Sequence, residues 1–118
     1  GQRRGRSVTR PYATRAAFQR LKREACAECE IDTATFDGRS RVHAASTARH
    51  LAWWRARDSL LVSYPQLGAW SGGRDPTTVW HGVQSLDAWL DGRTFESAAR
   101  KRERALEYYR AKKARGEI

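Results

Sequence analysis

The 118-residue chain has no methionine, two cysteines, three prolines and no apolar run long enough to cross a membrane. No apolar signal-peptide core follows the basic N-terminus, so we expect a cytoplasmic protein without a membrane partner. The lack of methionine, with Gly1 as a candidate expression remnant, indicates a trimmed chain. The sequence contains no phosphate-binding loop of glycines and lysine and no nucleophilic serine with a histidine and an acid. We therefore expect that the protein is not an enzyme and has no catalytic residue and no cofactor.

The two cysteines, Cys26 and Cys29, have C-x-x-C spacing, so a zinc site has to be weighed. The histidines that follow, His43 and His50, are separated by six residues, longer than the usual spacing of a zinc finger, and no second C-x-x-C exists. Both cysteines fall on a helix predicted over residues 13–28, where buried thiols are common packing residues. We therefore predict no metal site.

Positive charge is what the chain has in excess, with 23 lysines and arginines against 13 acidic residues and a formal charge of +10. A protein that neutralises a polyanion releases counterions, so this balance favours nucleic acid over a merely solvated basic surface. Arginine outnumbers lysine, which suits bidentate contacts to phosphate. The sequence does not indicate an oligomeric state.

The stretch from Ser63 to Leu90 predicts two helices joined by a tight turn. Ser63 begins a capping box, S-x-x-Q, that starts the first helix. Gly72 and Gly73 supply the permissive backbone of a sharp reversal. The pair Asp75-Pro76 indicates an N-cap followed by the first residue of the second helix.

The second helix carries one buried stripe, because its apolar residues recur at intervals of four, three and four. Thr77 and Thr78 lie off this stripe in the first turn, and a helix pair that presents short polar side chains there is suited to the DNA major groove. Of five tryptophans we expect core packing, except for Trp80, which also lies off the stripe. The stripe consists of Val79, Val83, Leu86 and Leu90.

Upstream of this pair, helical spacing predicts a helix over 13–28, a short helix within 31–36 capped by Asp32 or Thr33, and a basic loop over 37–41. A further helix over 47–59 is capped by Ser46. The face of the first helix expected to pack inward consists of Ala13, Ala16, Ala17, Leu21, Ala25 and Cys29, with Phe18 beside it.

A last helix is predicted over residues 94–115, after a break at Gly92. Docking against the domain is its favoured role, and pairing with a second copy or service as a linker stay open. The sequence thus predicts an all-α fold of five or six helices around a helix–turn–helix, with an extra C-terminal helix. Its three parts are a basic flexible arm over 1–12, the domain over 13–91, and a helix or linker over 92–118. The expected inner stripe of the last helix is Phe95, Ala98, Ala99, Arg102, Leu106 and Tyr109.

Residues 67–68 (LG) and 72–79 (GGRDPTTV) closely resemble the signature of the C-terminal domain of the bacterial replication initiator DnaA. The resemblance extends upstream through 39–41, 48–52 and 57–58 and ends near Leu90. It implies an all-helical, Trp-repressor-like module, domain IV of that family, which binds duplex DNA. A chain of this size has no room for the ATP-binding module of an initiator, so we expect a fragment or a protein that uses the module for another task.

The resemblance also implies which residues contact DNA. Arg41 corresponds to an arginine that enters the minor groove, and Asp75, Thr77 and Thr78 correspond to base-reading positions. Pro76 stands where the family has a base-reading histidine, so the sequence preference is expected to differ. His50 replaces a glutamine, and Arg55 replaces a core leucine. The full set of expected contacts is Arg41, Arg49, His50, Arg57, Pro65, Arg74, Asp75, Pro76, Thr77 and Thr78.

We expect a sequence-selective double-stranded DNA-binding protein of the bacterial nucleoid, the DNA-binding domain of a transcription regulator such as a phage-like or gene-transfer-agent activator. A replication-origin or DNA-packaging factor is one alternative. Another is a protein-interaction adaptor that acts through the C-terminal helix. Beyond duplex DNA, the protein partner left open is RNA polymerase or another protein, bound through that helix or through a region outside this sequence.

Overall fold

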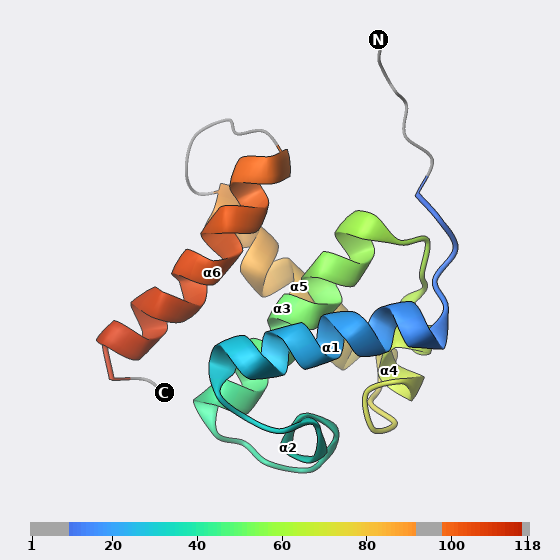
Figure 1. Cartoon of the computed structure of the whole chain (residues 1–118), viewed down its shortest axis with the longest axis horizontal. Coiled ribbons are helices and arrows are strands. Elements are labelled where there is room, and N and C mark those ends of the chain that lie inside the picture. Colours follow the sequence, from blue (N-terminus) through green and yellow to red (C-terminus); the bar gives the residue numbers. More distant parts are fainter. Residues whose placement is uncertain (1–9, 92–97, 117–118) are drawn as a thin grey trace, which may run out of the picture.

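The computed structural model describes residues 10–91 and 98–116, and within them the chain forms six α-helices and no β-strand (Figure 1). The all-α prediction is therefore confirmed. None of the helices in these two ranges is both long and apolar enough to cross a membrane. The helices are α1 (Arg15–Cys29), α2 (Thr33–Asp37), α3 (His43–Ser59), α4 (Tyr64–Ala69), α5 (Pro76–Asp91) and α6 (Ala98–Ala114).

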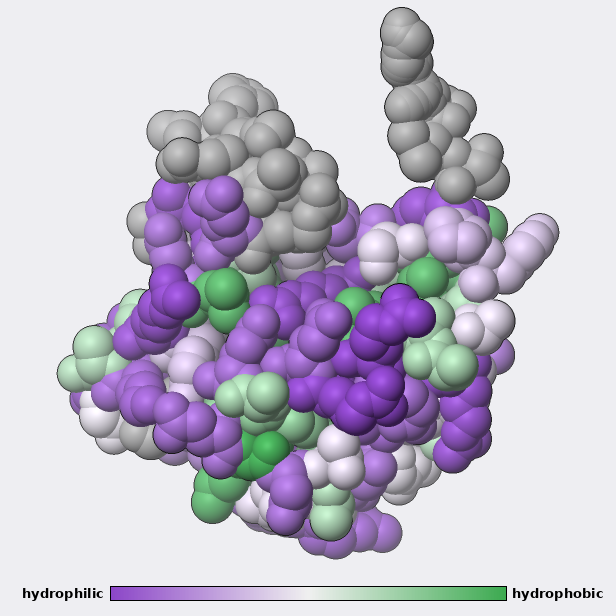
Figure 2. All heavy atoms as spheres, viewed as in Figure 1, coloured by the Kyte–Doolittle hydropathy of each residue, from purple (hydrophilic) through white to green (hydrophobic). Residues whose placement is uncertain are grey.

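Helix α3 is the centre of the fold, because it packs against α1 on one side and α5 on the other (Figure 1). Its side chains Leu51, Ala52 and Trp53 are almost completely buried. Phe18 of α1 and Val79 of α5 complete this core from the two sides. Figure 2 shows the face that α1 covers, where hydrophilic residues predominate and hydrophobic ones form only small separate patches. The hydrophobic burial is therefore concentrated around α3.

The helix pair α4–α5 forms as the sequence predicts. The Ser63 hydroxyl accepts a hydrogen bond from the Gln66 amide at 3.2 Å, which caps α4. Helix α5 begins at Pro76, and the Asp75 carboxylate accepts from the Thr77 amide at 2.7 Å. The predicted stripe lies inward, and all four of its members are buried: Val79, Val83, Leu86 and Leu90.

Two predictions about α1 and α3 are wrong in detail. The buried side of α1 includes Lys22, whereas Ala16 is exposed. Helix α3 begins one turn before the predicted Ser46 cap, at His43, and Val42 is its N-cap without a side-chain hydrogen bond. The Val42 carbonyl accepts from the amides of Ala45 and Ser46, so backbone hydrogen bonds close the first helical turn ahead of Ser46, without a side-chain cap. The buried members of α1 are Phe18, Lys22, Ala25, Cys26 and Cys29.

Helix α6 docks against the domain, the role that the sequence favoured for the last helix. The Trp89 ring of α5 meets the Tyr108 ring edge to face, with centroids 5.4 Å apart. The Lys113 ammonium lies 3.0 Å from a Glu30 carboxylate oxygen just after α1. The inner face is shifted from the prediction, because Leu106 is only half-buried. Its described buried members are Ala105, Tyr108 and Tyr109.

The segment before α1 is hydrogen-bonded to the chain that joins α3 to α4. The Leu61 amide donates to the Pro11 carbonyl at 2.8 Å, and the Ala13 amide donates to the Leu61 carbonyl at 3.0 Å. Arg10 donates from Nη1 to the Arg57 carbonyl at 2.5 Å. Of the predicted arm, residues 1–9 lie outside the described residues, as do residues 92–97 with Phe95, and residues 10–12 lie along this linker.

Candidate nucleic-acid interface

The loop that follows α2 and the turn between α4 and α5 lie side by side at the lower edge of Figure 1. Together with the start of α5 they line an open groove of about 490 Å³. Four arginines and two aspartates contribute to it, so the charge of the groove is positive. The lining residues are Asp37, Gly38, Arg39, Ser40, Arg41, Arg49, Gly72, Gly73, Arg74, Asp75 and Thr78.

Gly72 allows the two walls of the groove to meet. Its φ of +82° is a left-handed conformation that L side chains rarely adopt, and a Cβ atom there would overlap the Asp37 carbonyl. Gly68, near the end of α4, is also close-packed, because a Cβ atom there would overlap the Arg74 carbonyl. The turn between the helices is therefore held in backbone contact with the end of α2.

Arg49 and Arg74 direct their guanidinium groups at backbone carbonyls between the two walls. Arg49 is 7% exposed and donates from Nε to the Phe36 carbonyl at 2.8 Å and from Nη2 to those of Thr35 and Gly38 at 3.0 and 3.3 Å. Burial, and then the charge of Arg74, lowers the pKa of Arg49 to about 10, so the group stays charged at neutral pH.

Arg74 joins the turn to the loop in the same way. It donates from Nη2 to the Gly38 carbonyl at 2.5 Å and from Nη1 to the Ser71 carbonyl at 2.5 Å, with a longer contact of 3.4 Å to the Asp37 carbonyl. Burial lowers the pKa of Arg74 as well. These two arginines thus contribute positive charge to the groove while their bonds fix its shape.

The side chains that face solvent at this site come from the loop and from the first turn of α5. Arg39 and Arg41 are exposed on the loop, and Pro76, Thr77 and Thr78 are exposed on α5. The first-turn amides of α5 add a partial positive charge next to the arginines. Arginine and threonine side chains presented at one helix N-terminus can donate hydrogen bonds to phosphates and base edges.

Two residues near this surface, Arg39 and Trp80, are not among the ten expected DNA contacts. Arg39 lines the groove beside Arg41, and its place in the basic loop was a sufficient signal. Trp80 of α5 is 43% exposed and meets His81 edge to face at 5.1 Å, as its position off the apolar stripe predicted, although it was not named among the site residues.

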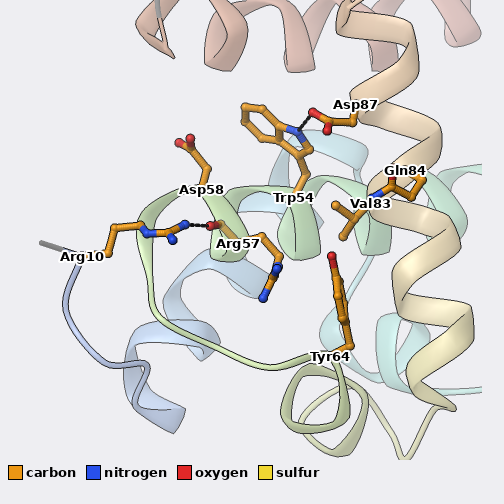
Figure 3. A pocket seen from close by; sticks show the side chains of 8 residues that line it. All are labelled: Arg10, Trp54, Arg57, Asp58, Tyr64, Val83, Gln84 and Asp87. Carbon is orange, nitrogen blue, oxygen red and sulfur yellow. Dashed lines mark hydrogen bonds between the residues drawn. The ribbon is translucent and has the colours of Figure 1, made fainter. Parts of the chain in front are cut away.

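Arg57 lies at a second pocket, of about 310 Å³, rather than at the groove (Figure 3). Its guanidinium lies 4.2 Å from the centroid of the Tyr64 ring and donates to the Val62 carbonyl at 2.6 Å. The Asp87 carboxylate on the opposite wall accepts from Trp54 Nε1 at 3.1 Å. The pocket therefore combines cations with carboxylates. Its residues are Arg10, Trp54, Arg57, Asp58, Tyr64, Val83, Gln84 and Asp87.

His50 is packed inside the domain and does not line the groove. Its ring centroid lies 6.1 Å from that of Trp53, and a Cβ atom on Gly82 of α5 would overlap the ring. Burial, followed by the charges of Lys112 and Arg49, lowers its pKa to about 4, so the imidazole is neutral at physiological pH. Of the ten expected DNA contacts, the groove brings together Arg41, Arg49, Arg74, Asp75 and Thr78, and Arg57, His50, Pro65, Pro76 and Thr77 lie outside its lining.

The two cysteines and Arg55, which the sequence singled out, contribute to packing and to an ion pair. Burial raises the pKa of the Cys26 thiol to about 11 and that of Cys29 to about 12, so both stay protonated. Within the described ranges no group of three histidine, cysteine or acidic side chains could hold a metal ion. Arg55, where the resemblance implies a core leucine, forms an ion pair with Glu28 at 2.8 Å.

The chain is similar in sequence to part of the bacterial DnaA proteins. A family model described as the bacterial dnaA protein helix-turn-helix matches residues 18–86, from α1 into α5, which is more than half of the chain. The chromosomal replication initiator protein DnaA of Sphingopyxis alaskensis is 32% identical over 74 residues, covering 63% of this chain and 16% of that protein. The protein of the same name from Roseiflexus castenholzii is 31% identical over 94 residues, covering 78% and 20%.

A third relative with that name, from Dechloromonas aromatica, is 36% identical over 59 residues, covering 50% of this chain and 13% of its own length. The chain thus spans no more than 20% of these relatives. The matched region contains both walls of the groove, whereas α6 lies beyond the family match. The chain belongs to the family of the bacterial DnaA helix-turn-helix, a DNA-binding fold.

Proposed function

We propose that this protein binds duplex DNA sequence-selectively, with α5 in the major groove. The observation that carries the proposal is the meeting of an exposed helix start and an arginine loop along one positive groove. A helix presented in this way reads base edges with its first residues. Thr77 and Thr78 offer hydroxyl and methyl groups to bases, and Asp75 and Pro76 flank them.

Arg41 is exposed on the loop beside α5, and we assign it to the adjacent minor groove. Arg57 and the basic residues before α1 are assigned to phosphates, with the exposed Pro65 next to the backbone. Arg49 and Arg74 contribute charge to the surface rather than direct contacts, because their guanidinium groups donate to protein carbonyls. His50 receives no DNA contact in this proposal, because its half-buried ring packs against Trp53 and is neutral.

The test is a fluorescence-anisotropy titration against a random duplex and against a duplex selected from a randomised pool, at several salt concentrations. Thr77→Ala should lower the preference for the selected duplex, by about tenfold for the loss of one base contact. Ser85→Ala is the matched control, since Ser85 is exposed on the same helix at a distance from its start. Equal effects of the two substitutions would contradict base reading by the start of α5.

Arg57→Ala should weaken binding to both duplexes alike and reduce the salt slope by about one, as expected for a lost phosphate contact. Arg23→Ala removes an exposed arginine of α1 that lines neither pocket, and it should leave the slope nearly unchanged. A protein-interaction adaptor would behave differently, because its complex would persist at high salt.

In the cell, we propose a role at a replication origin ahead of the role in transcription regulation. The relatives are named as chromosomal replication initiators, which favours the origin. The match covers a small share of those proteins, so the bacterial transcription regulator is retained as the second candidate. Chromatin immunoprecipitation with sequencing separates the two, because an origin factor gives sites clustered at the origin and a regulator gives sites at promoters.

A further inference from the structure

Lys22 of α1 is a buried cation, 1% exposed, in the middle of an otherwise apolar helix face. Its ammonium donates to both Asp37 carboxylate oxygens, at 2.9 and 3.1 Å, and to the Trp70 carbonyl at 2.9 Å. It also lies 5.7 and 5.3 Å from the ring centroids of Phe18 and Phe36. An ammonium has three N–H donors, so these three acceptors use its full capacity.

The three acceptors belong to the two walls of the candidate interface. Asp37 is the last residue of α2 and precedes the arginine loop, and Trp70 is the C-cap of α4 and precedes the turn that leads to α5. One ammonium therefore connects α1, the origin of the loop and the origin of the turn. Neither Asp37 nor Trp70 can move away without breaking a bond to a buried charge.

Burial of the side chain alone does not require a lysine at this position. Apolar side chains can often replace both partners of a buried ion pair at little cost in stability, because the pair has to recover the desolvation of both charges. Here the Asp37 side chain is 39% exposed, so its carboxylate can be solvated without the ammonium. What an apolar side chain cannot do is fix the distance between two polar segments through directed hydrogen bonds.

We infer that Lys22 is a positioning residue for DNA recognition, which touches no DNA and fixes the spacing of the arginine loop relative to the start of α5. The inference rests on the proposed function. Selective binding requires Arg41 and Thr77 to meet their grooves together, and a preorganised spacing removes the entropy cost of arranging them on binding. Nonselective attraction to phosphates needs no such spacing.

Lys22→Met tests the role, because methionine fills a similar volume without an ammonium. We expect faster amide hydrogen exchange at Gly73 and Arg74, whose amides donate to the Gly68 carbonyl at 3.1 and 2.9 Å, with exchange in the second half of α5 unchanged. This measurement uses the free protein, so it does not depend on DNA binding.

In the anisotropy titration, Lys22→Met should reduce the preference for the selected duplex at least about fivefold, while affinity for the random duplex changes by less than about twofold. The salt slope should not change, because no phosphate contact is lost. Lys113→Met is the matched control, since it removes an exposed ammonium of α6 by the same substitution and should retain the preference.

Asp37→Asn is the second variant, for use if Lys22→Met does not fold. It keeps an amide oxygen for the ammonium but removes the charge, and the Asp37 side chain is 39% exposed, so the new amide can still be solvated. It should reduce the preference in the same direction by a smaller factor. A folded core variant distant from the groove, Leu90→Val, reports what a loss of stability alone does to binding.

Three outcomes decide the inference. Unchanged exchange at Gly73 and Arg74 in Lys22→Met would overturn it. Faster exchange with an unchanged preference would also overturn it, because the link would then be structural only. If the wild type itself shows no preference for the selected duplex, the proposed function fails, and with it the positioning role, whatever the exchange data show.

Discussion

Replacement of His50 by glutamine should make the fold less sensitive to acid. The imidazole is packed against Trp53, and its Nδ1 is buried without a hydrogen-bond partner among the described residues. Burial, with Lys112 and Arg49 next in importance, lowers its pKa from an ordinary 6.5 to about 4. The folded state therefore resists protonation of this ring, whereas the unfolded chain accepts a proton at its usual pKa.

The sign and size of the effect follow from this difference. Between pH 6.5 and about 4 the unfolded state binds more protons than the folded state, so stability falls as the pH falls through that window. At a pH of about 5, the loss relative to pH 7.5 is about 2 kcal/mol, since one pKa unit corresponds to about 1.4 kcal/mol. For a chain of this size that corresponds to about 8 °C in the melting temperature.

Thermal unfolding followed by far-UV circular dichroism at these two pH values measures the effect. The wild type should lose about 8 °C more than His50→Gln on acidification. The carboxylates and the other two histidines are common to both proteins, so the difference between the two shifts isolates His50. Equal shifts in the two proteins would refute the assignment of an imidazole that stays neutral in the folded state.

Three further predictions concern single positions. Gly72→Ala should lower the free energy of unfolding by more than about 2 kcal/mol, because its Cβ atom meets a backbone carbonyl, whereas Gly73→Ala should cost only about 1 kcal/mol for its positive φ with open space around it; urea denaturation compares them. Cys26 and Cys29, protonated and buried, should react with a disulfide reagent at a pH of about 8 only after unfolding, and reaction of the native protein would contradict their burial. Trp80→Phe should leave the melting temperature within about 2 °C of the wild type and reduce the iodide quenching of the tryptophan fluorescence, since Trp80 is 43% exposed, and unaltered quenching would contradict that exposure.

The parts of the fold that local signals determine could be predicted. The Ser63 cap, the turn at Gly72 and the start of α5 at Pro76 each depend on a few neighbouring residues, and the structure contains all three. The apolar stripe of α5 was predicted for the same reason, since a helical period fixes which side chains share a face. Helix α2, with its Asp32 cap, is a further example.

The predictions that were wrong or missing concern features that depend on contacts between residues distant in the sequence. Lys22 is absent from the apolar face expected of α1, and its burial depends on Asp37, 15 residues away, and on Trp70, 48 residues away. The face expected from apolar spacing included Ala16 instead, which is exposed. Likewise, no spacing rule shows that the donors of Arg49 are directed at the end of α2.

The candidate site was predictable as a surface but not as a set of contacts. The resemblance located the start of α5 and Arg41, and both lie at one groove. It could not show that the His50 ring would pack against Gly82 of α5, because a sequence match transfers positions and not their exposure. The DNA contacts of the individual residues stay predictions.

The hydrogen bonds that Arg49 and Arg74 donate beneath the groove end on main-chain oxygens, those of Thr35, Phe36, Gly38 and Ser71 among them. A carbonyl group is present whatever side chain the residue carries, so mutations at these positions leave the acceptors in place. The exposed residues of the loop and of α5 can therefore diversify over evolution while the scaffold beneath them keeps its dimensions. If the exposed residues read DNA as proposed, surface substitution alone would change the target sequence.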